Sequence, residues 1–338
     1  MPTFCRHNRF VERCPICSKT LPDLTAGGRG SPRAPRAGKA AAGPATGRRR
    51  ARGADVRVHR EGRSADDGYR SALVPGVRAS TDAARLAAEI AFAGARLHAL
   101  GSDPPGLYGE ARSLGTQDIE RATWSCLLIV YLSPLEDVED PFAAIRPVLD
   151  AAPTLAAAEE LPDLAGVPLG PRSSHEPARG AETLLAYRDW VSRAGGEWNA
   201  QAVAFVGDPE WSPDRRFERL FERLALPGLG RTGRYELLVT LGRLGLYELR
   251  PDSLHLAGVR GASASDATTL AAKRVFGIGD PLLLDRRAAA LAEAAGVPVE
   301  ALDVALANWA APVRASVGVS PDLSDTEALA QAGEALGI

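Results

Sequence analysis

The amino-acid sequence predicts a mainly α-helical protein. Apolar residues recur at helical spacing in several segments after residue 80, and short runs rich in Pro and Gly separate these segments. Ser, Thr and Asp residues precede two of the segments, at positions where they can cap a helix. The first 79 residues lack this periodicity. We therefore expect a helical body over residues 80–338, a basic linker over 21–79 and a small zinc knuckle over 1–20.

Length and composition agree with this organisation. The chain has 338 residues, of which 45% are hydrophobic, so one or two domains with a sizeable core are expected. The formal net charge of −2 does not by itself indicate any class of partner. No signal peptide is visible, and the longest apolar run, Leu127–Leu132, is too short to span a membrane. We expect a cytoplasmic, nucleoid-associated protein, monomeric and without a membrane partner.

The N-terminal 20 residues carry the spacing Cys-x-His, six residues, Cys-x-x-Cys. Four such ligands suit tetrahedral Zn²⁺ and leave no open coordination position, so the predicted zinc ion is structural. A module this small would fold only with its metal. The alternative is a chance cluster of free thiols. The expected zinc ligands are Cys5, His7, Cys14 and Cys17.

Residues 21–79 are rich in Gly, Pro, Ala, Ser and Arg, which is typical of a flexible linker. Arg48, Arg49 and Arg50 lie near its centre and can neutralise DNA phosphates without sequence preference. The alternative is a solvated linker whose arginines reflect the codon usage of a GC-rich genome.

The body contains seven clearly periodic segments. The segment at 118–132 is apolar almost all round, so we expect it to be central, with Cys126 as core packing. Residues 203–206 fit a short strand or a helix end equally well. We expect two lobes, approximately 80–200 with the C-terminal tail and 201–312. The predicted helices are Ala83–Leu100 after the cap Ser80-Thr81-Asp82, Asp118–Leu132, Glu182–Ala194, Arg215–Leu226, Tyr235–Leu244, Ala267–Phe276 and Arg286–Ala295.

Two glycine-containing turns are candidates for a phosphate grip. The amides of Gly228 and Gly230 precede a helix, where backbone N–H groups and the helix dipole favour an anion, and Arg231 and Arg234 follow them. The alternative for this turn is a plain connection between two helices. A second turn lies over His255–Gly261, with the candidate DNA contacts Gly258, Arg260 and Gly261.

Asp285 is the candidate catalytic acid. It follows Val275-Phe276-Gly277 by a short spacing and is expected to stand at the start of a helix. A phosphate grip beside a single carboxylate is what an enzyme acting on a nucleic-acid base would need. The alternative is an N-cap for the helix from Arg286. Three other acids are expected to be surface or capping residues, namely Glu136, Asp140 and Glu236.

The run Val275-Phe276-Gly277 with Asp285 nine residues after the Phe resembles the helix-hairpin-helix DNA glycosylase superfamily. The Cys-Arg-His-Asn-Arg-Phe start, the Cys-Pro-Ile-Cys knuckle and the segment Tyr131–Glu136 resemble its α-glutamyl/putrescinyl-thymine pyrophosphorylase branch. The resemblance implies a glycosylase-like fold, DNA as the partner and a flipped-out, modified thymine as the substrate.

The chemistry implied by the resemblance is N-glycosidic hydrolysis or transfer at the substituent of the base. Members with lyase activity carry a Lys in the hairpin, and that position falls near Asp266 here, so no lyase activity is expected. A protein of another class, a non-catalytic protein that recognises modified DNA, is the alternative.

Overall fold

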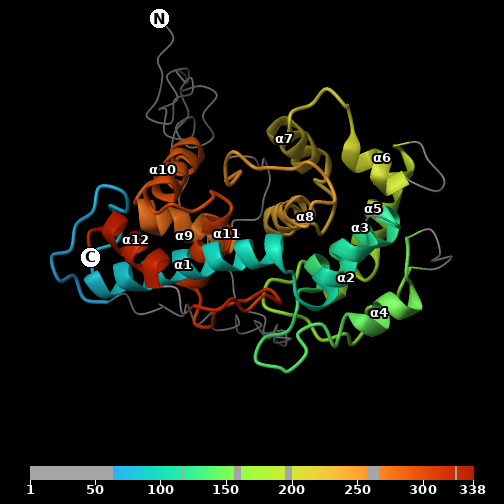
Figure 1. Ribbon diagram of the computed structural model, residues 1–338, viewed down its shortest axis with the longest axis horizontal. Coiled ribbons are helices and arrows are strands. Elements are labelled where there is room, and N and C mark those ends of the chain that lie inside the picture. Colours follow the sequence, from blue (N-terminus) through green and yellow to red (C-terminus); the bar gives the residue numbers. More distant parts are fainter. Residues whose placement is uncertain (1–63, 116, 156–160, 195–199, 257–265, 324–325) are drawn as a thin grey trace, which may run out of the picture. The chain divides into compact units, whose positions relative to one another are not determined.

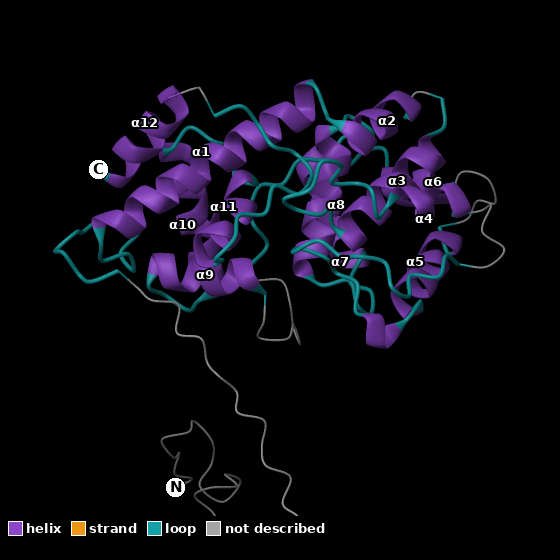
Figure 2. Cartoon of the chain, turned by 90° about the horizontal axis from the view of Figure 1, so that it is seen from below, coloured by secondary structure: helices purple, strands orange, loops and turns teal. Residues whose placement is uncertain are grey.

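A computed structural model describes residues 64–338 except 116, 156–160, 195–199, 257–265 and 324–325. Within these residues every regular element is a helix, and no strand is found (Figures 1 and 2). The mainly α-helical prediction is therefore confirmed for this part of the chain. The predicted zinc knuckle and residues 21–63 of the predicted linker lie outside the described residues.

The helices agree with most of the predicted segments. Residues 203–206 are helical, which decides the alternative left open by the sequence. The described elements are α1 (Ser80–Ser102), α2 (Gly106–Leu114), α3 (Ile119–Leu132), α4 (Arg146–Ala151), η3 (Pro177–Arg179), α5 (Glu182–Ser192), α6 (Ala200–Val206), α7 (Pro213–Arg223), α8 (Arg231–Arg243), α9 (Ala267–Phe276), α10 (Pro281–Ala294), α11 (Ala301–Ala310) and α12 (Thr326–Leu336).

One group of helices surrounds α11. This helix is buried from Ala301 to Trp309 because its sequence is apolar on nearly every face. It packs against α1 and α9, while α1 also packs against α12, and α10 contacts α9, α11 and α12. The first helix of the body is thus held by the last part of the chain.

The second group surrounds α3, which packs against α2, α6 and α8. Residues 122–132 of α3 are all buried, as predicted for a central helix, and the indole of Trp124 donates to the carbonyl of Ala152 at 2.7 Å. Cys126 is fully buried, which confirms its role in core packing, and burial raises the pKa of its thiol to about 12. The two lobes expected from the sequence stay a prediction.

A buried ion pair joins the two groups. Arg96 of α1 donates to Glu236 of α8 at 2.6 Å and to the carbonyl of Ser316 at 3.0 Å. Burial alone would raise the pKa of Glu236, but Arg96 and then Arg172 outweigh it and hold the pKa below its ordinary value. The prediction that Glu236 is a surface or capping residue is wrong, because a guanidinium compensates its charge inside the protein.

The segment before α1 belongs to the packed body. Val74 and Val77 are buried, and the N–H of Gly76 donates to the carbonyl of Val275 at 2.8 Å. Asp67 accepts from the N–H of Ser80 at 2.9 Å and so satisfies the start of α1. The cap predicted at residues 80–82 is therefore replaced by an acid from residues that the sequence assigned to the linker.

None of the helices in the described part of the chain has both the length and the apolar composition needed to cross a membrane.

Candidate functional site

The turn from Leu226 to Gly230 connects α7 to α8 and carries the first candidate phosphate grip. Gly228 has φ +75°, and a Cβ there would also lie 2.1 Å from the hydroxyl of Thr183, so only glycine fits. Gly230 caps α8 without a side-chain hydrogen bond, and open space lies beside its Cα. The first turn of α8 is thus accessible at Gly230, at the positive end of the helix dipole.

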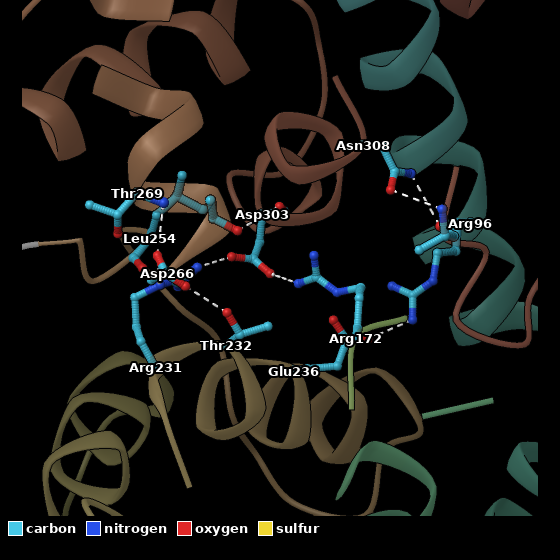
Figure 3. Close-up of polar contacts among 12 residues, drawn as sticks. Arg96, Arg172, Arg231, Thr232, Glu236, Leu254, Asp266, Thr269, Asp303 and Asn308 are labelled. Carbon is cyan, nitrogen blue, oxygen red and sulfur yellow. Dashed lines mark hydrogen bonds and ion pairs between the residues drawn. The ribbon is translucent and has the colours of Figure 1, made fainter. Parts of the chain in front are cut away.

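The guanidinium of Arg231 lies inside the protein. Its Nε donates to Asp266 at 3.0 Å, its Nη1 donates to the carbonyl of Leu254 at 2.9 Å, and its Nη2 donates to Asp303 (Figure 3). Burial would lower its pKa, but the charges of Asp303 and Asp266 raise the pKa above the ordinary value. With its side chain 2% exposed, Arg231 already has acceptors within the protein. Its contact with DNA stays a prediction.

Arg234 is also buried, but its acceptors are neutral. Its Nη1 donates to the carbonyl of Phe221 at 2.7 Å, and its guanidinium lies over the Phe221 ring at 4.3 Å. Burial, followed by the like charge of Arg231, lowers the pKa of Arg234 to about 10. The first turn of α8 therefore carries positive charge that its immediate surroundings do not neutralise. Contact of this guanidinium with DNA also stays a prediction.

The acid that the structure brings to this turn is Asp266. It caps α9, and its Oδ2 accepts from the N–H of Thr269 at 2.8 Å and from Arg231. Its Oδ1 accepts from the hydroxyl of Thr232 at 2.6 Å. Burial would raise the pKa of Asp266, but Arg231 and these hydrogen bonds lower it to about 2. The side chain remains 14% exposed.

Sequence reasoning missed this acid as a site residue. The available signal was an N-cap pattern, an Asp directly before the helix predicted from Ala267. That pattern identifies a cap but does not show that the cap lies against the turn before α8, since residues 232 and 266 are far apart in the chain.

Asp303 of α11 accepts from two guanidiniums. Arg172 donates to its Oδ2 at 2.5 Å, and Arg231 donates to its Oδ1. The Nε of Arg172 is buried with no hydrogen-bond partner in the structure. The surrounding network is balanced in charge, because three guanidiniums face three carboxylates. Its members are Arg96, Arg172, Arg231, Glu236, Asp266 and Asp303.

Asp285 lies in the second turn of α10 and not at its start. The helix begins at Pro281, and Asp280 caps it by accepting from the N–H of Leu282 at 3.0 Å. The N-cap alternative for Asp285 is therefore wrong. Its two carboxylate oxygens accept from the N–H of Leu256 at 3.2 and 3.1 Å. The catalytic role predicted for Asp285 stays a prediction.

Residues 254–256 lie between Asp285 and Arg231, which follows the turn before α8. Arg231 holds the carbonyl of Leu254, and Asp285 holds the N–H of Leu256. Between them, His255 adopts φ +52°, and its ring stacks on that of Phe221 at 4.5 Å. Burial lowers the pKa of His255 to about 4, so the imidazole is neutral near pH 7.

The remaining predicted acids have local roles. Glu136 accepts from the N–H groups of Ser316 and Val317 at 2.9 and 3.1 Å, and Asp140 pairs with the partly exposed Arg146 at 3.0 Å. The contact of Asp140 agrees with the predicted surface role, whereas Glu136 is half-buried and holds two N–H groups of a loop.

Several predicted site residues lie outside the described residues, and the structure leaves them as predictions. Within residues 64–338, apart from the gaps, no cluster of three or more His, Cys, Asp or Glu side chains could hold a metal ion. The predictions that lie outside are the zinc ligands Cys5, His7, Cys14 and Cys17, the linker arginines Arg48, Arg49 and Arg50, and the second turn with Gly258, Arg260 and Gly261.

Comparison with known proteins gives one family match. Neither the curated proteins nor the solved structures contain a match to this chain. The matched residues, 172–316, are less than half of the chain, but they include α7 to α11 and every member of the ion network except Arg96. Over this span the chain is similar to the family described as alpha-glutamyl/putrescinyl thymine pyrophosphorylase clade 3.

Proposed function

We propose that this protein is a DNA-binding enzyme that acts on a flipped-out, modified thymine base. We further propose that Asp266 and the turn before α8 form its reactive site. The observation that carries the proposal is the contact of Asp266 with Arg231 and Thr232, which holds a charged carboxylate against the first turn of α8. The matched pyrophosphorylase family supports a thymine derivative as the substrate.

The start of α8 suits a DNA phosphate. Its first amides point out of the helix, and the open space beside Gly230 lets a phosphate approach the backbone closely. The charge of Arg234, whose guanidinium donates to backbone carbonyls and lies over the Phe221 ring, favours an anion at the same end. The proposed phosphate contact therefore uses backbone amides, and the charge of Arg234 adds to the attraction of an anion.

Asp266 suits the stabilisation of positive charge. With a pKa of about 2 it is ionised at neutral pH and is a weak proton acceptor. Three donors occupy three of the about four lone-pair sites of a carboxylate, which leaves capacity on Oδ1. A fixed negative charge of this kind lowers the energy of a cationic transition state. Such a state develops at the sugar in glycosidic cleavage, or at the C5 substituent when a group leaves it.

Asp285 is the acid that the sequence resemblance implies, so the two acids must be compared directly. The experiment incubates DNA containing hypermodified thymine with the wild type, Asp266→Asn and Asp285→Asn, and then analyses the nucleosides by mass spectrometry. We expect the wild type to alter the modified nucleoside and Asp266→Asn to lose about 100-fold or more in rate. Loss of activity in Asp285→Asn alone would assign the chemistry to Asp285.

The same experiment tests the non-catalytic alternative. If the wild type alters none of the DNAs but binds them with an affinity that falls steeply with salt, the protein is a DNA-binding protein without catalysis.

The N-terminal residues extend the proposal. We propose that Cys5, His7, Cys14 and Cys17 bind a structural zinc ion and that Arg48, Arg49 and Arg50 add contacts to DNA phosphates. Metal analysis of the full chain should give one zinc per protein, and Cys14→Ser should lose it. A folded, metal-free wild type would contradict the zinc site.

A further inference from the structure

We propose that Arg231, together with Thr232, is a positioning residue that fixes the carboxylate of Asp266 and the segment 254–256 in one arrangement. The sequence predicts Arg231 as a direct contact to DNA, so this role is a different one. Its catalytic consequence rests on the proposed function, whereas the geometry does not.

The first argument is the direction of the three donors on Arg231. A guanidinium is planar and rigid, and it can serve several acceptors only if each lies near its plane. Here Nε, Nη1 and Nη2 meet Asp266, the carbonyl of Leu254 and Asp303 respectively. Three acceptors from three separate parts of the chain therefore fix the guanidinium in position and orientation.

The second argument is that Asp303, the acceptor of Arg231, is itself fixed by other hydrogen bonds. Arg172 donates to its other oxygen, and the hydroxyl of Thr268 donates to its backbone carbonyl at 3.1 Å. Because α11 is buried against α1 and α9, Asp303 has little freedom to follow a moving partner. The anchor of Arg231 is thus part of the core.

The third argument concerns Asp266. Arg231 holds Oδ2 and Thr232 holds Oδ1, so both oxygens of the carboxylate are fixed by neighbouring residues of α8. Two residues of α8 thus hold the acid against the turn before α8, while the N–H of Thr269 holds Oδ2 from α9 at 2.8 Å. A DNA backbone bound at Gly230 would meet the acid at a fixed distance and angle.

The fourth argument is that Arg231 also reaches the surroundings of Asp285. It holds Leu254, and Asp285 holds Leu256 two residues later. A change at Arg231 would thus disturb both acids. The proposed role does not depend on which of the two acids performs the chemistry.

The test compares Arg231→Lys with Arg96→Lys. Arg96 is an equally buried arginine that serves a carboxylate and a carbonyl, but these are Glu236 and Ser316 and not Asp266. A lysine keeps the positive charge but lacks the planar guanidinium with donors in three fixed directions. Stability, DNA affinity, the rate on modified DNA and the pKa of Asp266, measured by carboxyl NMR, are determined for both variants.

We expect the two variants to lose similar stability. Only Arg231→Lys should raise the pKa of Asp266 from about 2 towards its ordinary value of 3.8. The charge of Arg231 is the largest cause that lowers this pKa, and a lysine ammonium lacks the planar group that Asp303 and Leu254 hold in place beside Oδ2. The rate should fall by up to about 100-fold more than in Arg96→Lys, at nearly unchanged DNA affinity. If Arg231→Lys does not fold, Thr232→Val removes the other contact to the carboxylate, and a smaller rise in the pKa and a smaller loss of rate are expected.

The outcomes separate the two proposals. An unchanged pKa of Asp266 in Arg231→Lys or Thr232→Val would overturn the positioning role. A loss of DNA affinity without a pKa change would restore Arg231 as a direct DNA contact. A raised pKa in a protein whose wild type never alters DNA would leave the positioning role intact and contradict the proposed function.

Discussion

Both carboxylate oxygens of Asp285 accept from one backbone N–H, that of Leu256, at 3.2 and 3.1 Å. The acid comes from the second turn of α10, and the amide belongs to the segment that Arg231 holds at Leu254. Asp285 therefore anchors a piece of backbone, whatever else it does.

Two substitutions at Asp285 test whether its contact with Leu256 stabilises the fold. Asp285→Asn keeps an oxygen that can accept from Leu256, so it should lose less stability than Asp285→Ala. Asp285→Ala leaves that N–H without this acceptor and should cost about 1–3 kcal/mol. Chemical denaturation measures both values. If Asn and Ala lose the same stability, the contact with Leu256 does not stabilise the fold.

Alanine at Gly228 should mainly reduce stability, whereas alanine at Gly230 should mainly reduce DNA affinity. Gly228→Ala places a Cβ 2.1 Å from the hydroxyl of Thr183 at φ +75°, and should destabilise the protein by about 2 kcal/mol or more. Gly230→Ala meets open space and should cost about 1 kcal/mol or less as a cap. Its Cβ should nevertheless weaken DNA binding, as measured by fluorescence anisotropy. Unchanged affinity in Gly230→Ala would argue against a phosphate at this turn.

Asp266 should make the protein sensitive to acid. Its folded-state pKa of about 2 lies below the ordinary 3.8, so the unfolded chain binds the proton more tightly. The stability from this group is complete above pH 4 and is lost as the pH falls towards 2, by about 2 kcal/mol. The difference in unfolding free energy between the wild type and Asp266→Asn should shrink over that window. A constant difference would mean that the carboxylate is not specifically stabilised.

His255 should make the stability depend on pH in a higher range than Asp266 does. Burial lowers the pKa of its imidazole from 6.5 to about 4, so the unfolded chain again binds more protons between these values. Stability from the neutral ring is complete above pH 6.5 and declines as the pH falls towards 4. His255→Asn removes the titration and still tolerates the left-handed backbone. Its unfolding free energy should vary less than that of the wild type between pH 4 and 6.5, and an equal dependence would contradict the burial of the ring.

The sequence predicts the helices well where local signals are strong. The apolar run of α3 and the bounds of α9 agree with the structure, while Asp118, expected as the first residue of its helix, is the N-cap. The sequence predicts the start of α10 too late, because Asp285 resembles a cap as much as Asp280 does. Leu282 and Leu283 are exposed and add no apolar stripe to the first turn. Local chemistry therefore fixes the type of element better than its first residue.

The candidate site is harder to predict because its contacts are long-range. Arg96 and Glu236 are separated by 140 positions, and Arg231 and Asp303 by 72. A charged residue on a helix is solvated in most proteins, so a single sequence favours the surface for each of these side chains. Only packing shows that each has a buried partner of opposite charge.

The place of α1 has a practical consequence for fragments of this chain. The span similar to the pyrophosphorylase family begins at residue 172 and excludes α1, yet α1 covers α11 and supplies the cation that compensates Glu236. An expression fragment cut to residues 172–316 would place the apolar surface of α11 in water and leave a buried carboxylate without its counter-charge. A recombinant fragment for crystallisation or binding assays should therefore begin no later than residue 64 and retain the helix that ends at Leu336.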